Sequence, residues 1–180
     1  MRKQSAKTRL IRAFFTLIKD KHYSRISVSD LIVEANVSRT TFYRHYADVY
    51  DMYEKICLEM VNKMLEDFLE VFRQEGIVLT VLFDVFCEKL ESQREYIQLL
   101  CGKKGDRKFF EIGISAALSH ADSFYPYITE SERFLIKFVV FSCAGGYVKA
   151  LMDEVEFDKK HLEMYRRMLF YAQKAGESNE

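Results

Sequence analysis

Apolar residues recur at intervals of three and four positions along most of this chain, which is the spacing of one face of an α-helix. The most regular stretch runs from Val49 to Phe72, and it predicts a helix about 36 Å long. Asp48 stands where it can cap the start of this helix, and Gly76 follows its end. We expect the helix to supply core contacts and to act as the rigid link between the N-terminal part and the rest.

Two further helices are predicted before this link. The first covers residues 8–21. The second begins after Ser27, with Asp30 in place to complete a capping box, and ends near Asn36. Because asparagine tolerates the left-handed backbone conformation, Asn36 suits a tight turn between two helices.

A short capped helix follows the turn. Ser38 can accept hydrogen bonds from the amides of the first helical turn, and Phe42 and Tyr46, four positions apart, would face a core. The remaining surface of this helix carries Arg39, Thr40, Thr41, Tyr43, Arg44 and His45. Guanidinium, hydroxyl and phenol groups suit phosphate oxygens, and arginine suits guanine edges. A helix, a short turn and a capped basic helix predict a helix-turn-helix.

The same apolar spacing continues to the C-terminal end. It predicts helices over residues 77–92, 95–101, 107–120, 130–152 and 158–173, with Tyr125-Pro126 at a turn and a frayed tail from Lys174. The chain of 180 residues has one proline and seven glycines, a composition that favours an all-α protein.

The formal net charge of zero is the sum of two parts of opposite charge. Residues 1–46 contain ten Lys and Arg against three Asp and Glu, a net charge of +7, and residues 47–180 therefore carry −7. This asymmetry indicates that only the N-terminal part meets a polyanion.

Residues 8–53 resemble the N-terminal DNA-binding domain of the TetR family of bacterial regulators. The family pattern from the second helix through the third is matched by residues 27–46, and its Tyr-x-x-aromatic signature appears as Tyr43-Arg-His-Tyr46. Two positions depart from the pattern. Asn36 replaces the usual turn glycine, and Val49 stands where the family usually has a lysine that contacts phosphate.

This resemblance implies a helix-turn-helix domain over residues 1–48 and a helical ligand-binding and dimerisation domain over residues 49–180. It implies a sequence-specific regulator of double-stranded operator DNA, acting as a repressor. The side chains expected to face the major groove are Arg39, Thr40, Thr41 and Arg44, the two arginines being best suited to base edges. Those expected to hold phosphates are Lys7, Ser27, Ser38, Tyr43 and His45.

The helix over residues 130–152 is apolar nearly all round, which predicts burial on several sides. Gly145-Gly146 lies inside it, at a cost of about 1 kcal/mol each relative to alanine, and a close approach to another helix would offset that cost. TetR relatives pair their last two long helices across a two-fold axis. We therefore expect a homodimer through residues 130–152 and 158–173, with packing inside one chain as the alternative.

Aromatic residues are concentrated in the middle helices. The resemblance implies that this region encloses an apolar or aromatic small-molecule inducer, and the candidate lining residues are Phe83, Phe86, Phe109, Phe110 and Phe124. Aromatic residues at helical spacing are also ordinary core residues. The alternative is that the C-terminal part binds a protein partner instead of a small molecule, or that the protein has no inducer.

An enzyme is the competing class of protein. The four histidines show no metal-binding spacing, and no phosphate-binding or nucleophile-elbow motif is present. Cys87 or Cys101 could be proposed as a nucleophile with His120 as its base. Any chain with four cysteines and four histidines allows a pairing of this kind, so it carries little weight. We therefore expect no catalysis, no metal and no cofactor.

The four cysteines lie far apart, mostly among apolar residues, so we expect buried reduced thiols. The N-terminal segment leads into an amphipathic stretch rather than a signal sequence. The longest apolar run, residues 138–148, is too short to span a bilayer. These features predict a cytoplasmic protein without membrane segments.

Overall fold

A computed structural model of the chain describes residues 4–75, 78–101, 106–124, 130–152 and 159–177. Within these ranges the regular structure is helical and contains no strand, so the predicted all-α class is confirmed. The elements are α1 (Ala6–Ile18), the short 3-10 helix η1 (Tyr23–Arg25), α2 (Val28–Ala35), α3 (Arg39–His45), α4 (Val49–Glu75), α5 (Leu79–Ser92), α6 (Arg94–Cys101), α7 (Lys108–Phe124), α8 (Glu130–Met152) and α9 (Lys159–Glu177).

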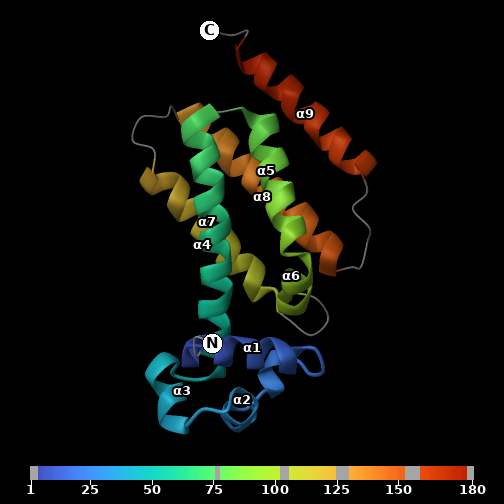
Figure 1. The fold of residues 1–180 in the computed structure, drawn as a ribbon. Helices are drawn as coiled ribbons and strands as arrows, with labels where there is room; N and C mark the ends of the chain where they lie inside the picture. The colour runs from blue at the N-terminus through green and yellow to red at the C-terminus, as the bar shows by residue number, and fades with distance from the viewer. Residues whose placement is uncertain (1–3, 76–77, 102–105, 125–129, 153–158, 178–180) are drawn as a thin grey trace.

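Helices α1, α2 and α3, with η1, lie together at one end of the molecule, and we call them the head (Figure 1). Helix α4 leaves the head and packs against α5 and α7. We call helices α5 to α9 the body. At 27 residues α4 is about 40 Å long. The predicted long link is therefore present, and it is three residues longer than its apolar stripe.

One continuous cluster of buried side chains joins the head to the body. It begins with Leu10 and Phe14 in α1, passes through Met52 and Tyr53 in α4, and reaches Leu100 at the end of α6. Each of these five side chains is fully buried. The apolar faces that the spacing predicted on separate helices thus meet in one core, which holds the head against the body.

Helix α9 packs along α5 at the outer side of the body (Figure 1). Leu169 of α9 is buried with Leu79 and Phe83 of α5. The side-chain oxygen of Gln173 accepts a hydrogen bond from the amide of Leu79 at 2.9 Å. Because the first turn of α5 has no cap from its own N-cap residue Val78, this long-range contact satisfies a donor that would otherwise lack a partner.

Several predicted boundaries were wrong. Helix α1 ends at Ile18, and η1, which no apolar spacing indicated, follows it. Helix α7 continues to Phe124, and α9 continues to Glu177. In α9 the amine of Lys174 lies 4.9 Å from the ring centre of Phe170, a contact that favours the added turn. The turn expected at Tyr125-Pro126 lies outside the described residues.

The glycine pair of α8 faces side chains of the same chain. A methyl group added at Gly145 would meet the ring of Phe110 in α7 at 3.6 Å, and one added at Gly146 would meet the hydroxyl of Tyr165 in α9 at 3.6 Å. Both are ordinary contact distances, so neither position requires glycine for close packing within this chain.

The buried thiols agree with the sequence prediction where they are described. Cys57 and Cys101 are fully buried and Cys87 is half-buried, and none of these three forms a disulfide within the described part of the chain. Burial raises the pKa of both Cys57 and Cys101 to about 12. The side chain of Cys143 lies outside the described part. Within the described ranges, no helix combines enough length and apolar character to cross a membrane.

Candidate nucleic-acid interface

The recognition surface begins with the cap of α3. The hydroxyl oxygen of Ser38 accepts a hydrogen bond from the amide of Thr41 at 3.1 Å and lies 2.8 Å from the Thr41 hydroxyl. Phe42 and Tyr46 are buried, as their four-residue spacing predicted. The residues that remain exposed on α3 are Arg39, Thr40, Tyr43 and Arg44, while Thr41 and His45 are half-buried. The short helix therefore presents a polar and basic face to solvent.

The turn before α3 has the geometry that the sequence predicted. Asn36 adopts the left-handed conformation, with φ of 49° and ψ of 58°. Its amide donates to the carbonyls of Ile32 and Val33, which closes α2. Asparagine can therefore take the place of a turn glycine, because its short polar side chain tolerates the left-handed conformation.

Arg9 of α1 holds this turn, which the sequence reasoning missed. Its guanidinium donates to the carbonyl oxygens of Ala35 at 3.1 Å and Asn36 at 2.7 Å. Carbonyls at a helix C-terminus carry partial negative charge, so a cation is favourable there. The sequence feature that could have indicated this role is the position of Arg9. A cation near the start of a helix is mildly unfavourable, which suggests that it has a partner elsewhere.

Ser27 and Asp30 form the expected capping box at the start of α2. The Ser27 hydroxyl oxygen accepts from the Asp30 amide at 3.1 Å, and the Asp30 carboxylate accepts from the Ser27 amide at 2.8 Å. Lys21 pairs with the same carboxylate at 2.7 Å. The hydrogen bonds from Lys21 and Ser27 lower the pKa of Asp30 to about 2. Ser27 is exposed, so its hydroxyl hydrogen is accessible to a phosphate oxygen.

Arg39 links the two helices of the motif. Its guanidinium donates to the hydroxyl of Ser29 in α2 at 2.8 Å, yet the residue remains exposed. This single bond uses one of the five guanidinium donors. The others are left for an external acceptor, and the bond to α2 restricts the side chain to one region of the surface.

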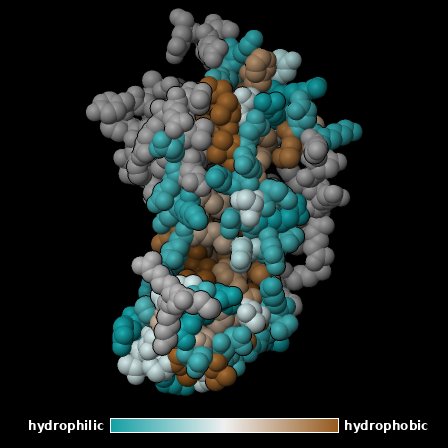
Figure 2. Space-filling model, viewed as in Figure 1, coloured by the Kyte–Doolittle hydropathy of each residue, from teal (hydrophilic) through white to brown (hydrophobic). Residues whose placement is uncertain are grey.

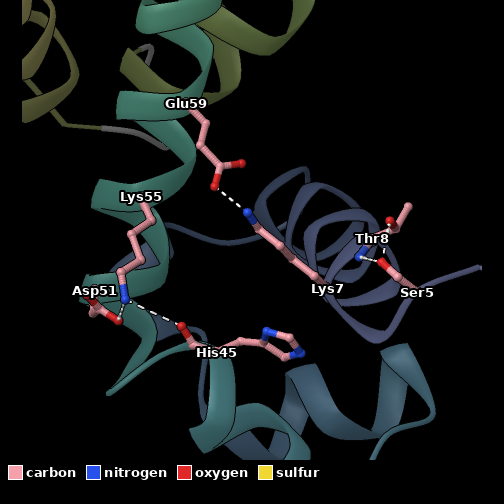
Figure 3. A network of polar contacts seen from close by, with 7 residues as sticks. All are labelled: Ser5, Lys7, Thr8, His45, Asp51, Lys55 and Glu59. Atoms are coloured by element: carbon pink, nitrogen blue, oxygen red, sulfur yellow. Dashed lines mark hydrogen bonds and ion pairs between the residues drawn. The ribbon is translucent and has the colours of Figure 1, made fainter.

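Behind α3 lies a basic hollow of about 370 Å³, lined by Lys7, Arg44, His45, Tyr46, Lys55, Leu58, Glu59 and Asn62. Figure 3 shows the Lys7 amine, from the start of α1, paired with the Glu59 carboxylate of α4. Lys55, on the same helix, donates to the His45 carbonyl at 3.3 Å and pairs with Asp51 at 2.8 Å. Lys55 was not predicted, because nothing in its spacing distinguishes it from an ordinary exposed lysine.

Tyr46 lies in the wall of this hollow. Tyr46 is 2% exposed, and its hydroxyl has no hydrogen-bond partner among the described residues. Burial, with smaller effects of Glu59 and Asp51, raises its pKa to about 12. The hollow as a whole is lined by three permanent cations and one carboxylate, an excess of positive charge that suits an anion.

The predicted DNA contacts thus fall into two groups. Ser38, Arg39, Thr40, Thr41, Tyr43, Arg44 and His45 lie on α3 or at its cap. Lys7, at the start of α1, lines the basic hollow beside α3 and pairs with Glu59 of α4, and Ser27 lies at the start of α2. The roles of these residues in DNA binding remain predictions.

The predicted inducer residues occupy two packed regions of the body. Phe83 is 2% exposed and stacks on Tyr165 of α9, with ring centres 6.3 Å apart. Phe109 is 4% exposed in the main core, and Phe110 contacts Phe141 of α8 edge to face. Phe86 is half-buried, and the side chain of Phe124 lies outside the described part. The basic hollow is lined by none of these residues, and their role in ligand binding remains a prediction.

The candidate nucleophile Cys101 and the candidate base His120 give the enzyme alternative no support. The raised pKa of Cys101 keeps its thiol protonated near neutral pH, and the side chain of His120 is not among those described. Among the described residues, no group of three His, Cys, Asp or Glu side chains is close enough to hold a metal ion.

No protein-family model matches the chain, but it is similar to proteins of known sequence and known structure. The chain is 26% identical over 158 residues to a protein named as an uncharacterized HTH-type transcriptional regulator of Haemophilus influenzae, covering 82% of this chain and 75% of that protein. Its structure is similar to the crystal structure of a TetR transcriptional regulator from Streptococcus agalactiae 2603V. The TM-score is 0.57 and the identity 23%, and the match covers 91% of this chain and 93% of the other. The expected TetR-like fold is confirmed.

Proposed function

We propose that this chain, a transcriptional regulator of the TetR type, binds double-stranded operator DNA with α3 in the major groove. The observation that carries the proposal is the exposed face of α3, where Arg39, Thr40 and Arg44 stand free of the core while Phe42 and Tyr46 fix the helix from behind. A short helix held in this way can enter the groove without loss of its own packing.

Base reading and phosphate binding fall to different residues. Arg39 and Arg44 have the exposed guanidinium groups that can pair with guanine edges. Hydroxyl, imidazole and amine donors for phosphates come from Ser38, Tyr43 and His45 on α3 or at its cap, from Ser27 at the start of α2, and from Lys7 in the basic hollow. Lys55, which lines the basic hollow, supplies positive charge on α4, the helix whose first residue is Val49 in place of the family's lysine.

The proposed regulator works as a homodimer through α8 and α9. Phe134, Phe138 and Phe141 of α8 are 67%, 57% and 55% exposed, and Met168 and Tyr171 of α9 are exposed as well. Several large apolar side chains on two helices of one body are typical of a surface that a partner covers. A second copy would also match the inverted half-sites of an operator.

The proposed mode of action is repression that a small apolar or aromatic molecule relieves. A ligand releases DNA only if it binds the DNA-competent and incompetent arrangements with different affinity. Helix α4, which shares the core of head and body, is suited to carry that difference. If the body binds a protein partner instead, the same link would serve. Because its target is chromosomal DNA, we place the protein in the cytoplasm.

The test is selection of bound sequences from a random duplex pool, followed by fluorescence anisotropy at two salt concentrations. We expect enrichment of an inverted repeat and a fall in log affinity with log salt of about 0.9 per phosphate neutralised. Arg44→Ala should alter the selected sequence, whereas Tyr43→Phe should weaken binding to all duplexes alike. Arg107→Ala, exposed just before α7 and outside α3, α8 and α9, is the matched control. Salt-insensitive binding without sequence enrichment would refute the proposal.

A further inference from the structure

A cleft separates the head from the body on one side of α4. Its volume is about 780 Å³, and it is bordered by α1, by α4 and by the α5–α6 corner. Figure 2 shows apolar surface, in brown, recessed between the head and the body. The volume lies within the range of small-molecule sites, about 300–1,000 Å³. None of the predicted inducer phenylalanines lines it.

The cleft has an apolar part, to which three elements contribute. Ile11 and Phe15 come from α1, Met60 and Met64 from α4, and Tyr96 from α6. Phe15 and Tyr96 touch edge to face across the head–body boundary, with ring centres 4.7 Å apart. Tyr96 is still 44% exposed. Aromatic and flexible thioether side chains together provide a surface that accepts an apolar group of variable shape.

The polar residues of the cleft carry an excess of positive charge. They include the cations Arg12, Lys19, Lys63 and Lys89 against the carboxylates Glu59 and Glu95. Glu59 is already paired with Lys7, and Glu95 with Lys19 at 3.5 Å. The Lys19–Glu95 pair is exposed on both sides, so its exchange for another anion costs little.

Lys63 is the cation best suited to a ligand. It is exposed, and it makes no hydrogen bond or ion pair with any residue that the structure describes. Its four-carbon stem can follow the apolar wall while its amine meets an anionic group. The cleft therefore combines an apolar floor with an unused positive charge.

We propose that this cleft binds a small amphipathic carboxylate, with the apolar tail against Phe15, Met60 and Tyr96 and the carboxylate at Lys63. Such a ligand would contact α1 of the head together with α6 of the body. Resting on the proposed function, this bridge gives the ligand a direct means to favour one arrangement of the head relative to the body.

Decanoate is the probe, and methionine methyl groups report its position. In protein labelled with ¹³C at the methionine methyls, decanoate should shift the signals of Met60 and Met64, which line the cleft. The signals of Met164 and Met168, exposed on α9, should not move. Met60→Leu and Met64→Leu assign the two signals. Shifts confined to the α9 methionines, or no shift up to the solubility limit of decanoate, would overturn the proposal.

Charge and chain length separate this site from general apolar binding. Decanol should bind more weakly than decanoate, and shorter acids should lose up to about fourfold in affinity per methylene removed. Lys63→Glu should raise the dissociation constant for decanoate at least about threefold, while Arg107→Glu, an exposed residue outside the cleft and outside α8 and α9, leaves it unchanged. Equal binding of decanol and decanoate, or no effect of Lys63→Glu, would contradict a carboxylate site.

Two further outcomes are distinguishable. If the Met60 and Met64 signals move with protein concentration rather than with decanoate, the cleft is a contact between copies, and the proposal fails. The methyl spectra are recorded without DNA, so the result for the cleft does not depend on whether the chain binds an operator.

Discussion

The Tyr53 hydroxyl donates a hydrogen bond to the carbonyl oxygen of Leu100 at 2.8 Å, joining the first part of α4 to the end of α6. Both residues are fully buried. The Tyr53 ring stacks on Tyr23 of the head, with centres 4.3 Å apart and planes 13° from parallel. Tyr23 in turn donates to the Asp106 carboxylate at 3.1 Å. The head is thus attached to the body by two tyrosines in contact.

Tyr53→Phe should lower the free energy of unfolding by about 1 kcal/mol, because one buried hydrogen bond is lost. The Leu100 carbonyl keeps a second donor, the Asp106 amide at 2.9 Å, which limits the cost. Urea unfolding measures the change. Tyr43→Phe is the control, since Tyr43 is 51% exposed on α3 and its hydroxyl should matter for DNA and not for stability. Equal effects of both substitutions on unfolding would contradict this assignment.

Asp30 should make the stability of the head depend on pH. Hydrogen bonds from Lys21 and Ser27 lower its pKa from 3.8 to about 2 in the folded chain. A lowered pKa stabilises the fold above the ordinary value, and this contribution is lost as the pH falls from 3.8 toward 2.

Asp30→Asn should therefore flatten the pH dependence of unfolding between about pH 5 and about pH 2. Urea unfolding at several pH values within that window measures the slope. Glu34→Gln, an exposed acid on the same helix, controls for a general loss of negative charge. An unchanged slope in Asp30→Asn would show that the capping box carries no linked proton.

Glu59→Gln should increase the affinity for DNA. Its carboxylate is the acidic group lining the basic hollow and is paired with Lys7, so its removal frees Lys7 and strengthens the positive potential beside α3. Because the pair is exposed, we expect a gain of about two- to fivefold at low salt and little change in stability. Fluorescence anisotropy measures it, with Glu66→Gln on α4 as the control of equal charge. A loss of affinity would mean that Glu59 positions Lys7 for phosphate.

Gly145→Ala and Gly146→Ala should each stabilise the chain by about 0.5–1 kcal/mol, since alanine favours a helix over glycine. The structure leaves room for each methyl group at 3.6 Å from its neighbour. Thermal unfolding and sedimentation measure stability and assembly together. If either alanine weakens self-association, a partner helix approaches α8 at the glycines, and the interface lies there rather than at the exposed phenylalanines.

Local sequence was enough to predict the helix-turn-helix. The Ser38 cap, the left-handed Asn36 and the buried Phe42 involve residues within a few positions of one another. Capping and helical spacing are short-range interactions, so their signals survive in the one-dimensional pattern. The same holds for the long α4, because its apolar stripe from Val49 to Phe72 covers all but the last three residues of the helix.

Contacts between distant segments were decided by the tertiary structure. Arg9 could be recognised as a misplaced cation, but its carbonyl partners lie more than 25 positions away. Lys7 was expected to hold phosphate and proved to be paired with Glu59 across 52 positions. Lys55 and the cleft between head and body carried no sequence signal at all. Long-range pairs have no fixed spacing, and only the packing of α1 against α4 and α6 brings these side chains together.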